Sequence, residues 1–214
     1  MDQIKIRLVG SIFFGVLWAR HLCAYGTHSL ALLWFFENLI FFGYFLAYLI
    51  RKFPVSKAGG FWERYFPFLP AGIPFLLVYN LPNWNTIKSL DLSRILTPAP
   101  VTNIEYAFAL QSIIMLGMAC SGLGVLSLRS SFSIMTEARE LITSGIYRYI
   151  SHPMYLGQFL TYAGITAFHS NTSRWLLYMI FVCSQILRIR IEENKLTKTF
   201  KDYSSYRKSC WISL

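Results

Sequence analysis

Residues 104–128 read "IEYAFALQSIIMLGMACSGLGVLSL", and no charged side chain follows Glu105 in them. An α-helix needs ~20 mostly apolar residues to cross the hydrocarbon layer of a bilayer, about 30 Å thick. Residues 104–128 meet this requirement, so we predict a transmembrane helix. Gly117 and Ser121 lie four residues apart in it, a spacing at which small side chains let two membrane helices approach closely.

Other apolar stretches lie on both sides of this helix. One begins at Ile6, a second covers residues 29–50, and a third, rich in proline and glycine, covers about 67–81. Two shorter stretches, about 154–168 and 175–187, follow and are separated by the polar turn "HSNTSR". Short connections of this kind join antiparallel helices, so the last two stretches predict a C-terminal helical hairpin.

The composition of the whole chain agrees with lipid as its solvent. The sequence is 55% hydrophobic, 17% aromatic and only 14% charged, and its mean hydropathy is +0.44. This is more apolar than a soluble chain of 214 residues requires. We therefore predict an all-α fold, a polytopic membrane protein of about five to six transmembrane helices that form one domain, residues 1–214.

The net charge of +10 is unevenly distributed. If the predicted spans alternate in direction, most of the 20 lysines and arginines fall on one side of the membrane. Cytoplasmic loops are the ones enriched in these residues, so we predict a cytoplasmic N-terminus, C-terminus and 129–152 segment. This distribution explains the charge without nucleic acid as a partner. The exceptions, on the opposite side, are Arg20, Lys88, Arg94 and Arg174.

The cysteines give no sign of a metal site or a disulfide framework. Four are present, far apart, and neither a CxxC pair nor a Cys/His ligand spacing occurs. We expect no bound metal.

The dense polar sequence lies in two segments, residues 128–158 and 187–209. The predicted hairpin enters the membrane between them and returns, which brings both to one surface. Arg148 and His152 can hold an anion there, and Pro153 can begin a helix whose free N–H groups face a ligand. The plainer alternative is a basic loop with interfacial aromatic residues, and the residue chemistry alone leaves both interpretations open.

The two segments together resemble a known superfamily. The motif "GIYRYISHPMYLG", residues 145–157, is followed after the hairpin by "RIRIEEN", residues 188–194, and then by "DYSSYRK". This order is similar to that of the integral-membrane methyltransferases, which include isoprenylcysteine carboxyl methyltransferases and phospholipid methyltransferases. The resemblance covers about residues 128–209. Ser151 departs from it, because many members carry an arginine at that position.

The resemblance implies that the cofactor is S-adenosyl-L-methionine, bound without a Rossmann domain, and the chain has no strand followed by GxGxxG. Residues 128–214 would then bind the cofactor at the cytoplasmic surface and catalyse transfer, while residues 1–127 form the pocket for a lipid acceptor. Two residues are expected to be catalytic: Arg190, which would orient the acceptor, and Glu193, which would accept hydrogen bonds from the cofactor. The residues expected to bind the cofactor are Tyr147, Arg148, His152, Pro153, Tyr155, Gly157, Glu192 and Glu193.

The acceptor is less defined. A carboxylate or thiolate needs no general base, and no dedicated base is evident, which favours O-methylation of an isoprenylcysteine-like carboxylate. A phospholipid amine, a lipid phosphate and a small thiol remain open, as does the oligomeric state. Glu37 is a further substrate-binding candidate, because an ionisable residue within a predicted span is unusual.

Two other kinds of protein are compatible with the sequence. One is a membrane reductase that uses a nicotinamide cofactor on sterol-type substrates, although few basic residues remain for a phosphate grip. The other is a transporter or scaffold without enzymatic activity. Binding of S-adenosylhomocysteine would separate the methyltransferase from both.

Overall fold

The structure is a computed structural model that describes all residues except 1–2, 24–30, 79–102, 169, 171 and 214. Its described residues form helices and two isolated bridges, with no strand, so the predicted all-α fold is confirmed. The helices are α1 (Gln3–Cys23), α2 (Ala31–Leu49), α3 (Gly60–Arg64), α4 (Phe68–Val78), α6 (Ile104–Leu128), α7 (Pro153–Phe168), α8 (Thr172–Thr199) and α9 (Tyr203–Ser209), and the short 3-10 helices are η3 (Arg129–Ser131) and η4 (Gly145–Arg148).

Helix α6 has the bounds that the sequence predicts. Its N-cap, Asn103, accepts hydrogen bonds from the backbone N–H groups of Glu105 and Tyr106, at 2.9 and 3.1 Å. Among the described residues, α6 together with η3 is long and apolar enough to cross a membrane. Arg7–Ala19 and Asn38–Leu49 are shorter apolar segments. The five to six spans remain a prediction.

Helices α6 and α7 cross at almost the closest distance that their backbones allow. A Cβ atom added to Gly117 would lie 2.6 Å from the carbonyl oxygen of Gly157 and from the backbone nitrogen of Thr161. One added to Gly157 would lie 2.5 Å from the backbone nitrogen of Ser121. The predicted small-residue contact at Gly117 and Ser121 is therefore confirmed, and it fixes the start of α7 against α6.

We expect Gly117→Ala to lower the thermal unfolding midpoint of the detergent-solubilised protein. The new methyl group would meet backbone atoms that cannot turn away, and overpacking of this kind costs roughly 1–3 kcal/mol. Gly122→Ala on the same helix is the control, because its Cβ would have Ile40 as nearest neighbour, at 3.8 Å. Equal midpoints for the two variants would contradict the close crossing.

The predicted hairpin is confirmed, since α7 and α8 are consecutive helices that pack against each other. Helix α8 continues to Thr199 without a break, well beyond the apolar stretch that the sequence predicts to end at 187. Arg188 and Glu193 therefore lie on one rigid helix instead of in a separate polar segment. The proline-rich stretch forms α4, with Pro74 inside it, and α4 packs against α8 and α7.

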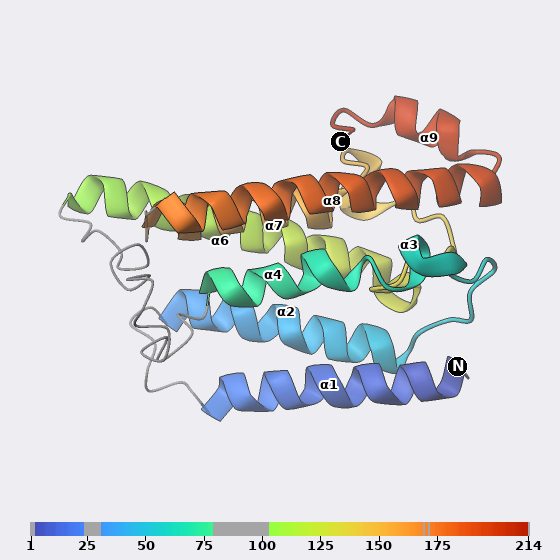
Figure 1. The fold of residues 1–214 in the computed structure, drawn as a ribbon, viewed down its shortest axis with the longest axis horizontal. Coiled ribbons are helices and arrows are strands. Elements are labelled where there is room, and N and C mark those ends of the chain that lie inside the picture. Colours follow the sequence, from blue (N-terminus) through green and yellow to red (C-terminus); the bar gives the residue numbers. More distant parts are fainter. Residues whose placement is uncertain (1–2, 24–30, 79–102, 169, 171, 214) are drawn as a thin grey trace, which may run out of the picture.

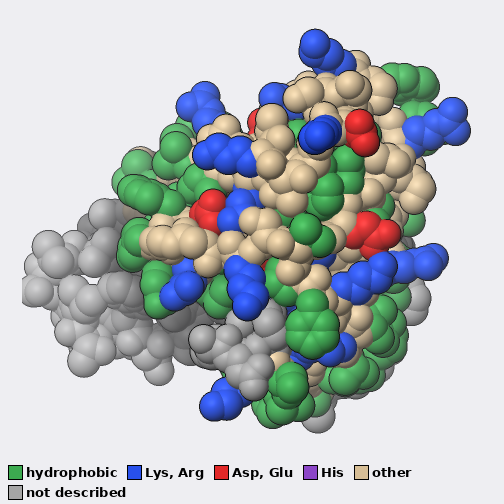
Figure 2. All heavy atoms as spheres, turned by 90° about the vertical axis from the view of Figure 1, so that its right-hand side faces the viewer, with side chains coloured by type: hydrophobic (Ala, Val, Ile, Leu, Met, Phe, Trp, Pro, Cys, Tyr) green, Lys and Arg blue, Asp and Glu red, His purple; other side chains and the backbone are tan. Residues whose placement is uncertain are grey.

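The long helices lie roughly parallel, and the first described turn of α1 and the tail helix α9 lie toward the same end of the molecule (Figure 1). Lysine and arginine side chains gather on this end, shown in Figure 2. The exposed ones in the described chain are Lys5, Lys52, Lys57, Arg64, Arg129, Arg148, Arg190, Lys198, Lys201 and Lys208.

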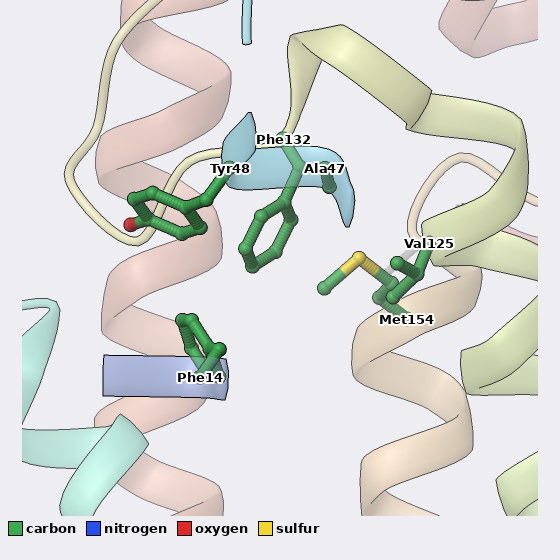
Figure 3. Packing of buried hydrophobic residues seen from close by; sticks show 6 residues of the cluster. All are labelled: Phe14, Ala47, Tyr48, Val125, Phe132 and Met154. Carbon is green, nitrogen blue, oxygen red and sulfur yellow. The ribbon is translucent and has the colours of Figure 1, made fainter. Parts of the chain in front are cut away.

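A core of aromatic and aliphatic side chains joins α1, α2, α6 and α7 to the segment that follows η3 (Figure 3). Phe14 of α1 and Tyr48 of α2 pack with Phe132, which follows η3, and with Met154 of α7. The Phe132 ring is 5.7 Å from that of Tyr48 in an edge-on arrangement. This core ties the polar 129–152 segment to the membrane helices.

Candidate functional site

A polar pocket lies at the basic end of the molecule. Its walls come from the 129–152 segment, the first turn of α7, the second half of α8 and the tail helix α9. The enclosed volume is about 80 Å³, room for a few water molecules. A ligand as large as a nucleoside therefore requires the side chains of the walls to move apart.

Four of the residues predicted to bind the cofactor line this pocket: Tyr147, His152, Tyr155 and Glu192. The hydroxyl of Tyr155 donates a 2.5 Å hydrogen bond to Glu192 Oε2. Burial, reinforced by the charge of Glu192, raises the pKa of Tyr147 well above its usual range, so this phenol stays neutral. The pocket thus offers neutral aromatic faces beside a carboxylate, surroundings that suit a cation.

Glu193 does not line the pocket but holds its wall together. It accepts a 2.9 Å charge-assisted hydrogen bond from Arg207 Nε, and its Oε1 lies 3.3 Å from His152 Nε2. The hydroxyl of Tyr203 donates to the same oxygen at 3.5 Å. Glu193 therefore joins α8 to α7 and α9, and it positions His152 against the pocket.

The structure places the other predicted cofactor residues away from the pocket walls. Arg148 is exposed, with its guanidinium 6.0 Å from the Tyr149 ring. Pro153 is the first residue of α7, and Gly157 lies in the crossing with α6. Glu37 belongs to α2, but its side chain lies outside the described part of the structure.

Two arginines of α8 differ in their positions. Arg190 is exposed and is absent from the described linings of both cavities, whereas Arg188 is 7% exposed and lines both. Arg188 Nη2 donates a 2.9 Å hydrogen bond to the carbonyl oxygen of Ile134, and the guanidinium lies 5.4 Å from the centre of the Tyr155 ring. Residues two apart face different sides of a helix, so of these two arginines Arg188 is the one that can meet a ligand in the cavities.

The second cavity is larger and apolar. Its volume is about 520 Å³, within the range of small-molecule sites, and side chains of α1, α2, α4, α6 and α7 line it. The two cavities are neighbours, because both are lined by Phe132, Ile134, Met135, Met154 and Arg188. A polar ligand in one and an apolar ligand in the other would come together at Arg188.

Two serine hydroxyls give the polar pocket spare capacity for hydrogen bonds. Ser131 and Ser151 both line it, and the buried oxygen of each has no partner among the described residues. Buried polar atoms are normally paired, so these hydroxyls indicate a polar ligand. Together with the tyrosines and Glu192, they fit the polar ribose and amino-acid groups and the cationic sulfur of S-adenosylmethionine.

A buried ionic cluster fastens the 129–152 segment to α2. Arg51, which follows α2, donates a 2.5 Å hydrogen bond to Glu137 Oε2, and Arg139 pairs with the same oxygen. Arg139 Nη1 also donates to the carbonyl oxygen of Lys52 at 2.8 Å. Burial and the charge of Arg51 lower the pKa of Arg139 to about 10, so the guanidinium remains charged at neutral pH.

Sequence reasoning missed several residues of the site. Arg188 precedes Arg190 in "RIRIEEN", and only the rotation of α8 distinguishes them. Tyr203 and Tyr206 line the polar pocket from α9, and the tyrosine spacing in "DYSSYRK" was the available signal. No such signal marked the Glu137–Arg139 pair, because Arg51, which also pairs with Glu137, is distant in the sequence.

Part of the chain is similar to a known protein family. Residues 104–203, just under half of the chain, match the phospholipid methyltransferase family. No curated protein matches the chain. The matched range contains α6, the hairpin and the described lining of the polar pocket except for Tyr206 of α9.

Proposed function

We propose that this protein methylates the amine of a zwitterionic phospholipid head group. Residues 104–203 match the phospholipid methyltransferase family, whose members are membrane enzymes that use S-adenosylmethionine and a lipid acceptor. The observation that carries the proposal is the position of Arg188 in the walls of both cavities. This buried arginine lies beside the Tyr155–Glu192 hydrogen bond. Arg188 can pair with the phosphate of such a head group, and the carboxylate of Glu192 can pair with the ammonium group that follows the phosphate.

The polar pocket would hold the cofactor. Tyr147, Tyr155 and His152 present aromatic faces, and Ser131 and Ser151 present free hydroxyls. Bound there, S-adenosylmethionine supplies a methyl group on a positively charged sulfur. The residues of the pocket contribute position and the exclusion of water, the main requirements of a direct displacement.

The apolar cavity would hold the acceptor. Arg188 can bind the phosphate oxygens, and the acyl chains would lie among the side chains of α1, α2 and α4. An ammonium group must lose a proton before its nitrogen can attack. Glu192, which lines the neighbouring polar pocket and already accepts from Tyr155, would receive this proton. Arg188 and Glu192 would thereby hold the neutral amine beside the methyl group that the bound cofactor supplies.

The membrane orientation follows from the charge. The exposed lysines and arginines gather at the end of the molecule that contains the polar pocket, and cytoplasmic surfaces carry such an excess. We place the pocket and both termini on the cytoplasmic side, with five to six spans. A water-soluble cofactor would reach the polar pocket from the cytoplasm, while the lipid enters from the bilayer.

The test is incubation of the purified protein with methyl-labelled S-adenosylmethionine and a membrane lipid extract. We expect label in a phospholipid, and after alkali treatment it should remain non-volatile, because an N-methyl group is stable to base. A carboxyl methyl ester would instead release labelled methanol. Volatile label on a prenylcysteine acceptor would overturn the proposal in favour of O-methylation.

A further inference from the structure

The apolar cavity contains a polar feature that the proposed reaction does not use. Tyr44 of α2 and Gln158 of α7 both line it, and Gln185 of α8 lies behind Gln158, 1% exposed. Gln185 Nε2 donates a 2.5 Å hydrogen bond to Gln158 Oε1. Tyr44 belongs to the same cavity wall as Gln158. Three helices thus contribute to one polar cluster at the cavity wall, the phenol of Tyr44 and the hydrogen-bonded pair Gln158–Gln185.

This polar cluster can form further hydrogen bonds with a ligand. A phenol hydroxyl can both donate and accept. The side-chain oxygen of Gln158 accepts a hydrogen bond from Gln185. The amide N–H groups of Gln158 are therefore the ones that can face Tyr44 and the cavity. A polar group among apolar side chains is unfavourable unless it is paired. Tyr44 therefore presents a donor to whatever fills the cavity.

The position of this polar cluster relative to Arg188 identifies the part of the acceptor that the cluster would contact. Gln158 follows Tyr155 by three residues on α7, and Gln185 precedes Arg188 by three on α8. Helix α7 leads inward from the polar pocket and α8 leads back to it, so the glutamines lie about 4.5 Å deeper, three residues at 1.5 Å each. In a diacyl phospholipid, the ester carbonyls lie a few bonds beyond the phosphate, toward the acyl chains.

We infer that Tyr44 and Gln158, supported by Gln185, bind an ester carbonyl of the acceptor while Arg188 binds its phosphate. The inference rests on the proposed function and narrows the substrate class to ester-linked glycerophospholipids. An ether-linked lipid has the same head group and chains but no carbonyl oxygen for Tyr44.

The experiment compares two phosphatidylethanolamines of equal chain length, one diacyl and one dialkyl, with the full-length protein in detergent micelles. We expect kcat/KM to be about fivefold higher for the diacyl lipid, the effect of one neutral hydrogen bond, and the difference to lie in KM. Tyr44→Phe keeps the ring that stacks on Phe132. It should reduce the diacyl value to that of the dialkyl lipid and leave the dialkyl value unchanged.

Tyr178→Phe is the matched control. Its hydroxyl donates to the carbonyl oxygen of Phe159 at 3.1 Å and lies outside the described lining of the cavity, so the diacyl preference should persist. Equal values for both lipids in the unaltered protein would overturn the inference while the proposed function stands, as would an equal loss on both lipids in Tyr44→Phe. Methylation of neither lipid would overturn both.

Discussion

Replacing Arg188 by alanine is expected to lower kcat/KM for methyl transfer by about 30-fold or more. Among the described residues, Arg188 is the cationic side chain that lines both cavities. Truncating one member of a buried, hydrogen-bonded charge pair, here the pair of Arg188 with the acceptor phosphate, typically costs about 2–5 kcal/mol, a factor of about 30 or more. Arg188→Lys should recover only part of the loss, because an ammonium cannot bind two phosphate oxygens in the planar geometry of a guanidinium. Methyl incorporation from labelled cofactor measures the effect.

Arg190→Ala is the control on the same helix, two residues away. Its side chain is exposed, so we expect less than about a threefold change, as is usual for surface positions. The sequence pointed to Arg190 as the residue that orients the acceptor, and this pair of variants decides between the two arginines. A large loss in Arg190→Ala with an active Arg188→Ala would reverse the assignment. Unfolding midpoints of both variants would show whether a loss reflects folding instead.

Replacing Glu137 by glutamine is expected to destabilise the protein strongly, by roughly 3–5 kcal/mol, the usual cost of breaking a buried ion pair. The carboxylate is the one that both Arg51 and Arg139 contact, and Arg51 is 1% exposed. Neutral glutamine would leave two guanidinium groups buried side by side without a negative partner. The thermal unfolding midpoint in detergent should fall by many degrees.

Glu140→Gln is the matched control, three residues further along the same segment. Glu140 pairs with Lys52 at 2.5 Å, but the two side chains are 47% and 57% exposed. Exposed pairs contribute about 0–1 kcal/mol, so its midpoint should stay close to that of the unaltered protein. Comparable losses in the two variants would show that the buried cluster does not hold the 129–152 segment.

Much of the fold could be predicted because its signals are local. Helix α6 requires an uninterrupted apolar run with an asparagine cap, and both are visible in residues 103–128. The hairpin requires two apolar stretches and a polar turn. The glycine at 117 signals a close helix contact without naming the partner, and the structure supplies it at Gly157.

The site was only partly predictable, because its geometry depends on how helices rotate and pack. Tyr147, His152, Tyr155 and Glu192 were predicted and do line one pocket. The choice between Arg188 and Arg190 depends on which face α8 turns toward α7, and short-range spacing cannot give that rotation. The same holds for Gln158 and Gln185, which meet only because α7 and α8 are antiparallel neighbours.

Composition and the order of the motifs therefore indicate a helical chain that is suited to lipid, and the motifs resemble those of enzymes that use a methyl donor. Tertiary packing alone decides that a polar and an apolar cavity share one buried arginine. The physical reason is range: a hydrophobic run or a cap acts within a few residues, whereas Arg51, Glu137 and Arg188 reach their partners only after distant helices have packed.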